Sequence, residues 1–408
     1  MKHIVTLTAL LFSMFAMHTP AVAQTAQAGD DGAAYTMSAS PLPNWLAPGE
    51  KIKQVPSDLK RELTVKTPAG FRIPAEYEPV SVVVLGWKAY TGLLTGIVKA
   101  ASAHGAQVWA VDGPSKISGV SNYKSISFPL DSVWMRDYGP FGIKNGSQLG
   151  IVDSIYRHYQ YRPDDDALPK KLGNYAGAGV YSMNIILDGG NLMVDSLGNL
   201  YMTKRTYKWN SDKSESEVNQ ILKDSLKVKN IYTFEYAGYP GDPSDGTGHI
   251  DMFMKLLNDN TVLIAKSEDE PFKTTCEKAV KWFEGNTAPN GKPWKIVRSE
   301  GWYTSSGVWY TYTNSLIVNN TVIMPSFSGH SKEEAGAIAA YKAGMPGVTV
   351  VPVSSDDSIV DGGSVHCVTQ TLPVAPSAKK DNKVVEVETP VIGKDVPESL
   401  KPLENQKF

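Results

Sequence analysis

The segment Gly362-Gly363-Ser364-Val365-His366-Cys367-Val368-Thr369 joins a pair of turn-forming glycines to residues typical of a β-strand. The pattern predicts a tight turn that delivers Cys367 into a strand. A similar glycine turn occurs earlier, as Asp188-Gly189-Gly190-Asn191, and Asp361 precedes the later one in the same way. The two turns weakly indicate an internal repeat, because glycine pairs are common in turns.

Three other segments also place polar groups among apolar neighbours. Ser132–Pro140 carries Trp134 and the pair Arg136-Asp137, and Tyr312-Thr313-Asn314-Ser315 opens an apolar run. Gly248-His249-Ile250-Asp251-Met252-Phe253 alternates polar and apolar residues. In a strand, alternate side chains share a face, so this alternation predicts a strand with His249 and Asp251 side by side.

The four groups Asp137, Asp251, His249 and Cys367 match what a guanidinium substrate requires. The cation is a planar fork of donors, which carboxylates bind through paired hydrogen bonds. A thiolate attacks its carbon without help from a metal. A histidine protonates the departing ammonia and then activates the hydrolytic water. The sequence therefore favours deimination of a guanidino group, with Cys367 as the nucleophile.

Each of these residues also has a structural interpretation. Asp137 beside Arg136 is equally consistent with a structural ion pair, and His249 with Asp251 fits a solvent-facing pair on an edge strand. Cys367 fits a small core residue. Cys276 competes as nucleophile, because the dipole of a helix that begins near it would lower a thiol pKa. The sequence neighbours of Cys276 are charged, and no His and no glycine turn lies near it. This favours a structural role for Cys276.

Periodicity predicts an α/β or α+β chain, in which strands and helices alternate. Capping-box patterns predict helix starts at Ser214-x-x-Glu217, Thr274-x-x-Glu277 and Ser331-x-x-Glu334. Apolar runs predict six strands: Val80–Leu85, Gln107–Val111, Leu149–Ile155, Thr261–Ala265, Ser315–Val318 and Val348–Val353.

Bulk properties exclude several classes of function. The 408 residues carry a net charge of −2, which gives no support for a nucleic-acid partner. Two cysteines are too few for a disulfide framework or a cysteine-rich zinc module, although the two could pair in an oxidising compartment.

The chain ends predict the domain organisation. Lys2 and His3 precede the apolar stretch Ile4–Met17 and the small-residue site Ala21-Val22-Ala23, a pattern typical of a signal peptide over 1–23. We therefore expect a secreted or periplasmic protein that is free of the membrane after cleavage. Residues 24–72 read as a tether or wrapping segment, 73–373 as the catalytic domain and 374–408 as a tail.

Five motifs, in order, resemble the family of agmatine deiminases and Porphyromonas-type peptidylarginine deiminases. They are Trp134-x-Arg136-Asp137-Tyr138-Gly139-Pro140, Gly189-Gly190-Asn191, Gly248-His249-x-Asp251, Tyr312-Thr313-Asn314-Ser315 and Gly362-Gly363-x-x-His366-Cys367-x-Thr369. Ala75-Glu76-Tyr77-Glu78 is similar to the family's opening, so the resemblance covers roughly 76–373.

The resemblance implies an α/β fold, a five-bladed pseudo-symmetric propeller of ββαβ repeats around a central channel. It also implies roles: Cys367 as nucleophile, His249 as general acid and base, Asp137 and Asp251 as the guanidinium clamp, and Asn314 as part of the pocket. Trp134 would line the channel and Asn191 would support it from behind. No metal or other cofactor is implied.

The substrate is either peptidyl arginine, in a peptide or protein, or a small guanidino compound such as agmatine. Peptidylarginine members of the family carry two arginines that hold a substrate carboxylate. Arg162 matches the second of these, Gln160 falls where the first would be, and Arg157 is a candidate substitute. Together with the signal peptide, this favours peptidyl arginine converted to peptidyl citrulline, with agmatine as the alternative.

Three other classes remain open. A cysteine peptidase would use Cys367, His249 and Asn314, but it leaves two acidic residues unexplained. A metallohydrolase would use His249, Asp251, His366 and Cys367, although adjacent strand residues point to opposite faces, and insensitivity to chelators would exclude it. A binding protein without catalysis would not need the thiol.

Overall fold

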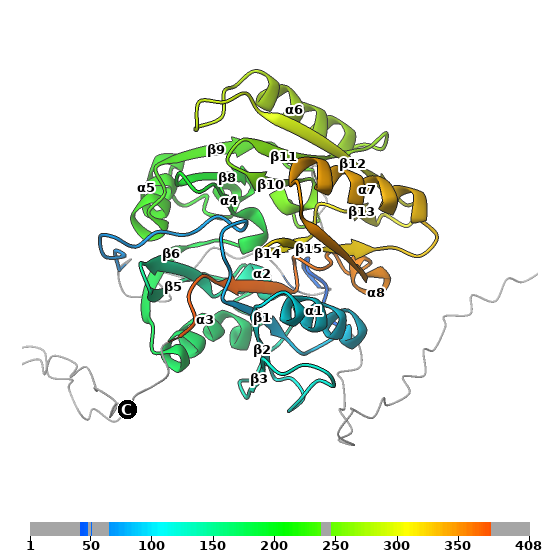
Figure 1. Cartoon of the computed structure of the whole chain (residues 1–408). Coiled ribbons are helices and arrows are strands. Elements are labelled where there is room, and N and C mark those ends of the chain that lie inside the picture. Colours follow the sequence, from blue (N-terminus) through cyan, green and yellow to red (C-terminus); the bar gives the residue numbers. More distant parts are fainter. Residues whose placement is uncertain (1–40, 48–49, 51–64, 238–245, 377–408) are drawn as a thin grey trace, which may run out of the picture.

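The computed structural model describes residues 41–47, 50, 65–237 and 246–376 (Figure 1). The expected signal peptide and nearly all of the expected tail lie outside the described residues. In the described part of the chain, no helix combines the length and hydropathy needed to cross a membrane.

The strands form five small mixed sheets. The first sheet has the strand order β17 (Thr369–Leu372), β1 (Val82–Gly86), β2 (Gln107–Val111), β3 (Tyr123–Ile126), and the second has the order β4 (Phe141–Asn145), β5 (Gln148–Ile155), β6 (Gly179–Ile186). The third has the order β7 (Met193–Val194), β8 (Asn199–Thr203), β9 (Asn230–Phe234), and the fourth has the order β10 (Met254–Asn258), β11 (Thr261–Lys266), β12 (Lys295–Tyr303), β13 (Trp309–Thr311). The fifth has the order β14 (Leu316–Val318), β15 (Thr321–Ser326), β16 (Thr349–Ser354).

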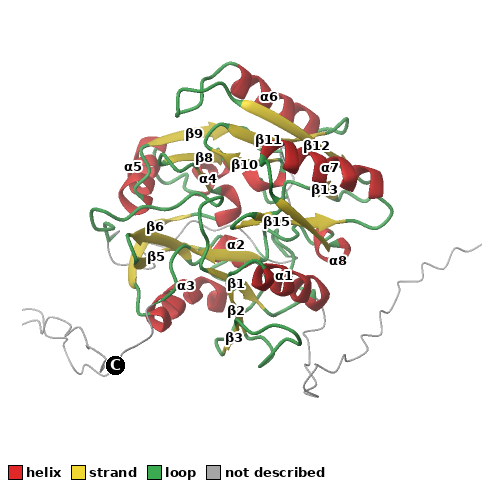
Figure 2. Cartoon of the chain, in the orientation of Figure 1, coloured by secondary structure: helices red, strands yellow, loops and turns green. Residues whose placement is uncertain are grey.

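Every sheet contains an antiparallel pair followed by a parallel pair. The first sheet adds a second parallel pair, β2 with β3, and the sheet that begins with β10 adds a second antiparallel pair, β12 with β13. A parallel pair requires a crossover, and the crossovers carry at least one helix, except the connection from β2 to β3 over residues 112–122. The crossover helices are α1 (Thr91–Ala103), α3 (Pro163–Ala176), α4 (Arg205–Trp209), α5 (Glu215–Leu226), α6 (Phe272–Glu284) and α7 (Ser331–Gly344). In Figure 2 most of these helices lie on the outside of the sheets. In the first sheet, β17 comes from the end of the domain and closes onto β1.

Hydrophobic burial explains why these segments form the core. All five residues of β1 are buried, which suits a strand with neighbours on both faces. Helix α1 buries Leu93, Leu94, Ile97 and Val98, one stripe of an amphipathic helix. The six predicted strands are confirmed, with ends that differ by at most two residues.

All three helices predicted from capping-box patterns are present, and α7 begins at Ser331 as predicted, but only one of the three predicted capping boxes forms. Ser214 and Glu217 form the predicted capping box at the start of α5. Helix α6 instead begins at Phe272 after Pro271, so Thr274 lies inside the helix, where its hydroxyl donates to Glu270. Helix α7 begins at Ser331 with no side-chain cap, and the carboxylate of Glu334 accepts from Ser326 on the neighbouring strand. In both cases a nearby polar partner replaces the local capping bond.

Candidate active site

The five sheets meet at one site, which is formed by the short segments that precede β4, β7, β10, β14 and β17, the first strand in the order of each sheet. Asp137 lies on α2 (Met135–Tyr138) before β4, and Gly190 lies on η2 (Gly189–Asn191) before β7. Asp251 lies on η3 (Ile250–Met252) before β10, Asn314 precedes β14, and Cys367 precedes β17. Residues far apart in sequence therefore occupy equivalent places in successive units.

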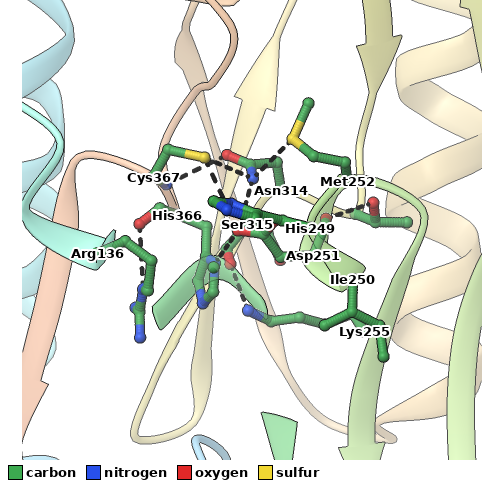
Figure 3. A network of polar contacts seen from close by, with 12 residues as sticks. Arg136, His249, Ile250, Asp251, Met252, Lys255, Asn314, Ser315, His366 and Cys367 are labelled. Carbon is green, nitrogen blue, oxygen red and sulfur yellow. Dashed lines mark hydrogen bonds and ion pairs between the residues drawn. The ribbon is translucent and has the colours of Figure 1, made fainter. Parts of the chain in front are cut away.

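Cys367, Asn314 and Asp251 form the sulfur side of the site (Figure 3). The Asn314 side-chain amide donates to Cys367 Sγ at 3.1 Å and to Asp251 Oδ2 at 3.1 Å. Cys367 Sγ lies 3.8 Å from the same carboxylate oxygen. The Asn314 carbonyl oxygen Oδ1 accepts from the backbone N–H of Ser364 and Cys367, which holds the cysteine turn in place.

His249 lies between two carboxylates. Its Nε2 lies 3.2 Å from Asp188 Oδ2, and its Nδ1 lies 3.5 Å from Asp137 Oδ1. Arg157 Nε also lies 3.2 Å from Asp188 Oδ2, and Arg157 and His249 lower the pKa of Asp188 to about 2 against the opposing effect of burial. An ionised Asp188 accepts the Nε2 proton, so Nδ1 is the nitrogen left to exchange a proton with a substrate.

Gly190 packs directly against these side chains. A Cβ atom at this position would lie 2.5 Å from His249 Nδ1, 2.8 Å from Asp137 Oδ1 and 3.2 Å from Asp251 Oδ2. Its backbone N–H donates to Asp137 Oδ1 at 2.9 Å. Glycine is therefore required at position 190, because only a residue without a side chain lets the backbone approach these groups so closely.

We expect Gly190→Ala to lower kcat/KM by about 100-fold, because the added methyl group displaces His249 and Asp137 from their positions. Gly336→Ala is the matched control, since Gly336 lies in helix α7 and an added Cβ would meet nothing within 4 Å. That control should keep its activity and gain up to about 1 kcal/mol of stability. Equal activity in the two variants would contradict the close approach at Gly190.

Burial raises the pKa of Asp137 to about 6, with the partial opposition of His249 and the support of Asp188 and Asp251. Below that pH the carboxylate is protonated and loses its attraction for a cation. We expect kcat/KM for a guanidino substrate to fall as the pH is lowered through about 6. A pH–rate profile of kcat/KM checks this, and a profile that stays flat well below pH 6 would contradict it.

A buried charge network lies beneath Asp251 and was not predicted from the sequence. His366 bridges two carboxylates, with Nδ1 2.6 Å from Asp251 Oδ2 and Nε2 2.7 Å from Glu76 Oε2. Lys255 Nζ lies 2.5 Å from the other oxygen of Glu76. A lysine within the apolar strand β10 was the feature of the sequence that could have indicated a buried charge here. These groups orient Asp251 so that its remaining oxygen faces away from the network. Asp188 was also missed as a partner of His249, although its turn was singled out.

Several local predictions about the site residues were wrong. Gly248–Phe253 is not a strand: His249 precedes the 3₁₀ turn η3, and both His249 and Asp251 are buried, which excludes a solvent-facing pair. Cys367 lies in a turn, and the strand begins only at Thr369. His366 and Cys367 therefore do not point to opposite faces, and both approach Asp251.

The proposed ion pair between Asp137 and Arg136 is also absent from the described residues. Arg136 turns away, and its guanidinium donates to the carbonyl of His366 and to Gln370. Cys276 is buried in α6, and burial raises its pKa to about 12, which opposes the predicted dipole effect and supports a structural role.

Arg157 and Arg162, the predicted carboxylate-binding residues, are both buried and already paired. Arg157 contacts Asp188 and donates to the backbone carbonyl of Asn44, whereas Arg162 donates to Glu50 and to the carbonyl of Trp45. In this conformation neither guanidinium is available to a substrate carboxylate. The sequence could not reveal this, because the partners Asn44, Trp45 and Glu50 lie more than 100 positions away.

Trp134 and Asn191 support the site from behind. Trp134 was expected to line the channel, but its side chain is fully buried at the start of α2, where its indole donates to the carbonyl of Leu42 and it lies against Gly363. Asn191 Oδ1 accepts from the backbone N–H of Ile250, which joins η2 to η3. Asn191 therefore has the supporting position expected for it.

The described residues also include one cluster compact enough to hold a metal ion, formed by Asp137, Asp188 and His249. This set differs from the ligands considered in the metallohydrolase hypothesis and lacks Cys367. Arg157 already supplies a positive charge to Asp188 at this place.

The family match, together with a buried cysteine, a histidine and two carboxylates that meet between five mixed sheets, places the protein among the hydrolases of C–N bonds in linear amidines. The chain belongs to the Porphyromonas-type peptidyl-arginine deiminase family, whose model matches residues 72–373.

Sequence relatives and solved structures agree with this assignment. The agmatine deiminases of Pseudomonas aeruginosa (strain LESB58) and Ectopseudomonas mendocina (strain ymp) are each 25% identical over 362 residues, which cover 76% of this chain and 97% of theirs. The structure of Enterococcus faecalis agmatine deiminase has a TM-score of 0.67 at 20% identity and covers 78% of this chain and 100% of that one. For C. jejuni agmatine deiminase the TM-score is 0.63 at 19% identity, with 76% and 99% covered. These structural likenesses establish a shared fold.

Proposed function

We propose that the protein deiminates a guanidino group to a ureido group and releases ammonia. The observation that carries this proposal is a set of buried polar atoms without hydrogen-bond partners among the described residues: Asp137 Oδ2, Asp251 Oδ1 and His249 Nδ1. Buried polar atoms are nearly always paired, so such a group calls for a ligand. Two carboxylate oxygens beside a thiol suit a planar cation with several N–H donors.

The proposed reaction uses the four groups in two stages. Cys367 Sγ attacks the guanidinium carbon while Asp137 and Asp251 hold its nitrogens. His249 Nδ1 gives a proton to the leaving nitrogen, the C–N bond breaks, and ammonia departs from a thiouronium intermediate. Water then attacks the same carbon and gives its proton to His249, and the C–S bond breaks. Substrate plus water thus becomes a ureido product plus ammonia, with the thiol restored.

The charges of the site favour attack only when the substrate is bound. Burial, together with the negative charges of Asp251 and Asp137, raises the pKa of Cys367 well above its usual value. A guanidinium held between those carboxylates offsets their charge and favours the thiolate. The cation therefore activates the nucleophile that attacks it.

For the substrate, we infer a small guanidino compound of the agmatine type in preference to peptidyl arginine. The named relatives of similar length are agmatine deiminases, and agmatine has no carboxylate that would require Arg157 or Arg162. The pairing of both arginines within the chain supports this choice over the peptidyl arginine expected from the sequence. Peptidyl arginine remains the second candidate, supported by the family description.

The deciding experiment compares ureido product from agmatine, free arginine, an internal peptidyl arginine and a C-terminal peptidyl arginine. We expect the highest kcat/KM for agmatine. Product from none of the four compounds would overturn the proposed deimination, and a clear preference for a peptide would reverse the choice of substrate. Ammonia release without backbone cleavage separates this reaction from that of a cysteine peptidase.

Two further expectations stand as proposals. We infer that the five units are the blades of a propeller, since Asp137, Gly190, Asp251, Asn314 and Cys367 hold equivalent places before successive sheets. The signal-like pattern over 1–23 supports export to the periplasm or medium. N-terminal sequencing of the mature protein from each cell fraction tests the second expectation.

A further inference from the structure

The residues that precede the catalytic domain include a segment that crosses the active site. This segment, residues 42–47 together with Glu50, is named here the strap, and it appears in dark blue in Figure 1. The indole of Trp134 donates to the Leu42 carbonyl at 2.7 Å, and the Asn44 N–H donates to the Asp361 carbonyl at 2.7 Å. Both anchors adjoin the glycine turn that carries Cys367.

The strap is anchored by buried basic residues. Arg157 donates to the Asn44 carbonyl at 2.5 Å, and Arg162 donates to the Trp45 carbonyl at 3.1 Å. Arg162 also donates to both oxygens of Glu50, at 3.2 and 3.1 Å, a bidentate pair. His158 Nδ1 lies 3.0 Å from the same carboxylate. A fully buried guanidinium needs a carboxylate partner, so Glu50 is the strongest single anchor of the strap.

The strap packs against the glycine turn that precedes the nucleophile. The Trp45 ring lies against Gly362, where an added Cβ would come within 2.8 Å of two ring atoms. The next residue, Gly363, packs against Cys367 Sγ, so the indole contacts the same glycine turn that contacts the sulfur. A cavity of about 600 Å³ is lined by Trp45, His249 and Gly362 but not by Cys367, which is fully buried. This cavity reaches the site at His249 and is bounded on the side of the strap by Trp45.

The side chain of Asn44 has hydrogen-bonding capacity that the described residues do not use. This side chain is fully buried, yet neither the amide nitrogen nor the amide oxygen has a hydrogen-bond partner among the described residues. The main-chain groups of Asn44 are used as anchors, which leaves the side-chain amide with both a donor and an acceptor for a bound molecule.

We propose that the strap is a specificity element of the active site, which admits slim guanidino compounds and excludes arginine that is part of a peptide. A guanidino group on a thin alkyl chain can use the approach beside His249. The main chain on both sides of a peptidyl arginine would need the space at the cavity wall that Trp45 occupies. This inference rests on the proposed deimination and names what selects its substrate.

The test compares wild type, Glu50→Gln and the matched control Glu277→Gln. Glu277 lies on helix α6, and its carboxylate pairs with Arg298 on strand β12. kcat/KM is measured for agmatine and for a peptide with an internal arginine. We expect Glu50→Gln to raise the peptide-to-agmatine ratio by about tenfold or more, because the bidentate pair that closes the strap is lost. The control should keep the wild-type ratio.

A second readout does not depend on turnover. The rate at which iodoacetamide alkylates Cys367, followed by peptide mass spectrometry, should rise by about tenfold in Glu50→Gln. The buried Cys276 is an internal control and should stay protected. Trp45→Ala should change the ratio and the alkylation rate in the same direction, and it leaves all buried charges paired if Glu50→Gln fails to fold.

An unchanged alkylation rate in folded Glu50→Gln and Trp45→Ala would overturn the strap as a cover. Faster alkylation with an unchanged substrate ratio would overturn its role in specificity. If wild type converts neither substrate, the proposed deimination fails, whereas the alkylation rates still decide whether the strap covers Cys367.

Discussion

Cys367→Ser is expected to abolish formation of ureido product, with a loss of kcat on the order of 10⁴-fold or more. The hydroxyl of serine is a far weaker nucleophile than a thiolate, and the acidic surroundings of this position oppose its ionisation further. The substitution nearly preserves volume, and Asn314 can still donate to the oxygen. Steady-state ammonia release measures the loss, and an acid quench of wild type followed by intact mass should reveal the covalent adduct.

Cys276→Ala is the matched control, because Cys276 is the other cysteine and lies buried in α6, away from the charged groups of the site. It should keep its activity and lose only the modest stability that a small buried side chain contributes. Circular dichroism and thermal unfolding should show that both variants fold. Retained turnover in Cys367→Ser, with loss in Cys276→Ala, would transfer the nucleophile to Cys276.

Asp137→Asn and Asp251→Asn are expected to lower kcat/KM by about 10- to 100-fold each, since every charge-assisted hydrogen bond to the substrate is worth about 1.5–3 kcal/mol. The loss in Asp251→Asn should be larger, because Asp251 also contacts Asn314 and His366 beside the sulfur. Both variants keep the shape of the site and remove only charge. Kinetics with a guanidino substrate measure the two effects.

Asp153→Asn is the control for these variants, because Asp153 is also a buried aspartate but lies within strand β5, outside the site. Its kcat/KM should stay near that of wild type. If Asp137→Asn or Asp251→Asn bound and converted substrate as well as this control, the two carboxylates would not be the guanidinium clamp.

The sequence motifs identified Cys367, His249, Asp137, Asp251 and Asn314 as candidates, and the structure brings all five together. The local geometry inferred for them was less accurate. Alternation in Gly248–Phe253 indicated a strand, whereas the chain forms a 3₁₀ turn there. Alternation reports which side chains are buried together, and a short turn between sheets can bury the same residues as a strand.

The partners of charged residues were the least predictable feature. Arg136 and Asp137 are neighbours in sequence but point to different partners, Gln370 and Gly190. Arg162 binds Glu50 across 112 positions. Buried charges choose partners by distance in the folded state, and sequence separation carries little information about that distance.

By itself, the sequence determined which reactive side chains are available and the positions of six of the strands, because apolar periodicity and the types of reactive side chain are local properties. Only the tertiary structure decided the rest: that a carboxylate from before the catalytic domain pairs with Arg162, that His366 contacts Asp251, and that Trp45 packs against the glycine turn before Cys367. Each depends on segments that meet only when five sheets close around a common centre, where buried charges must find partners wherever the chain supplies them.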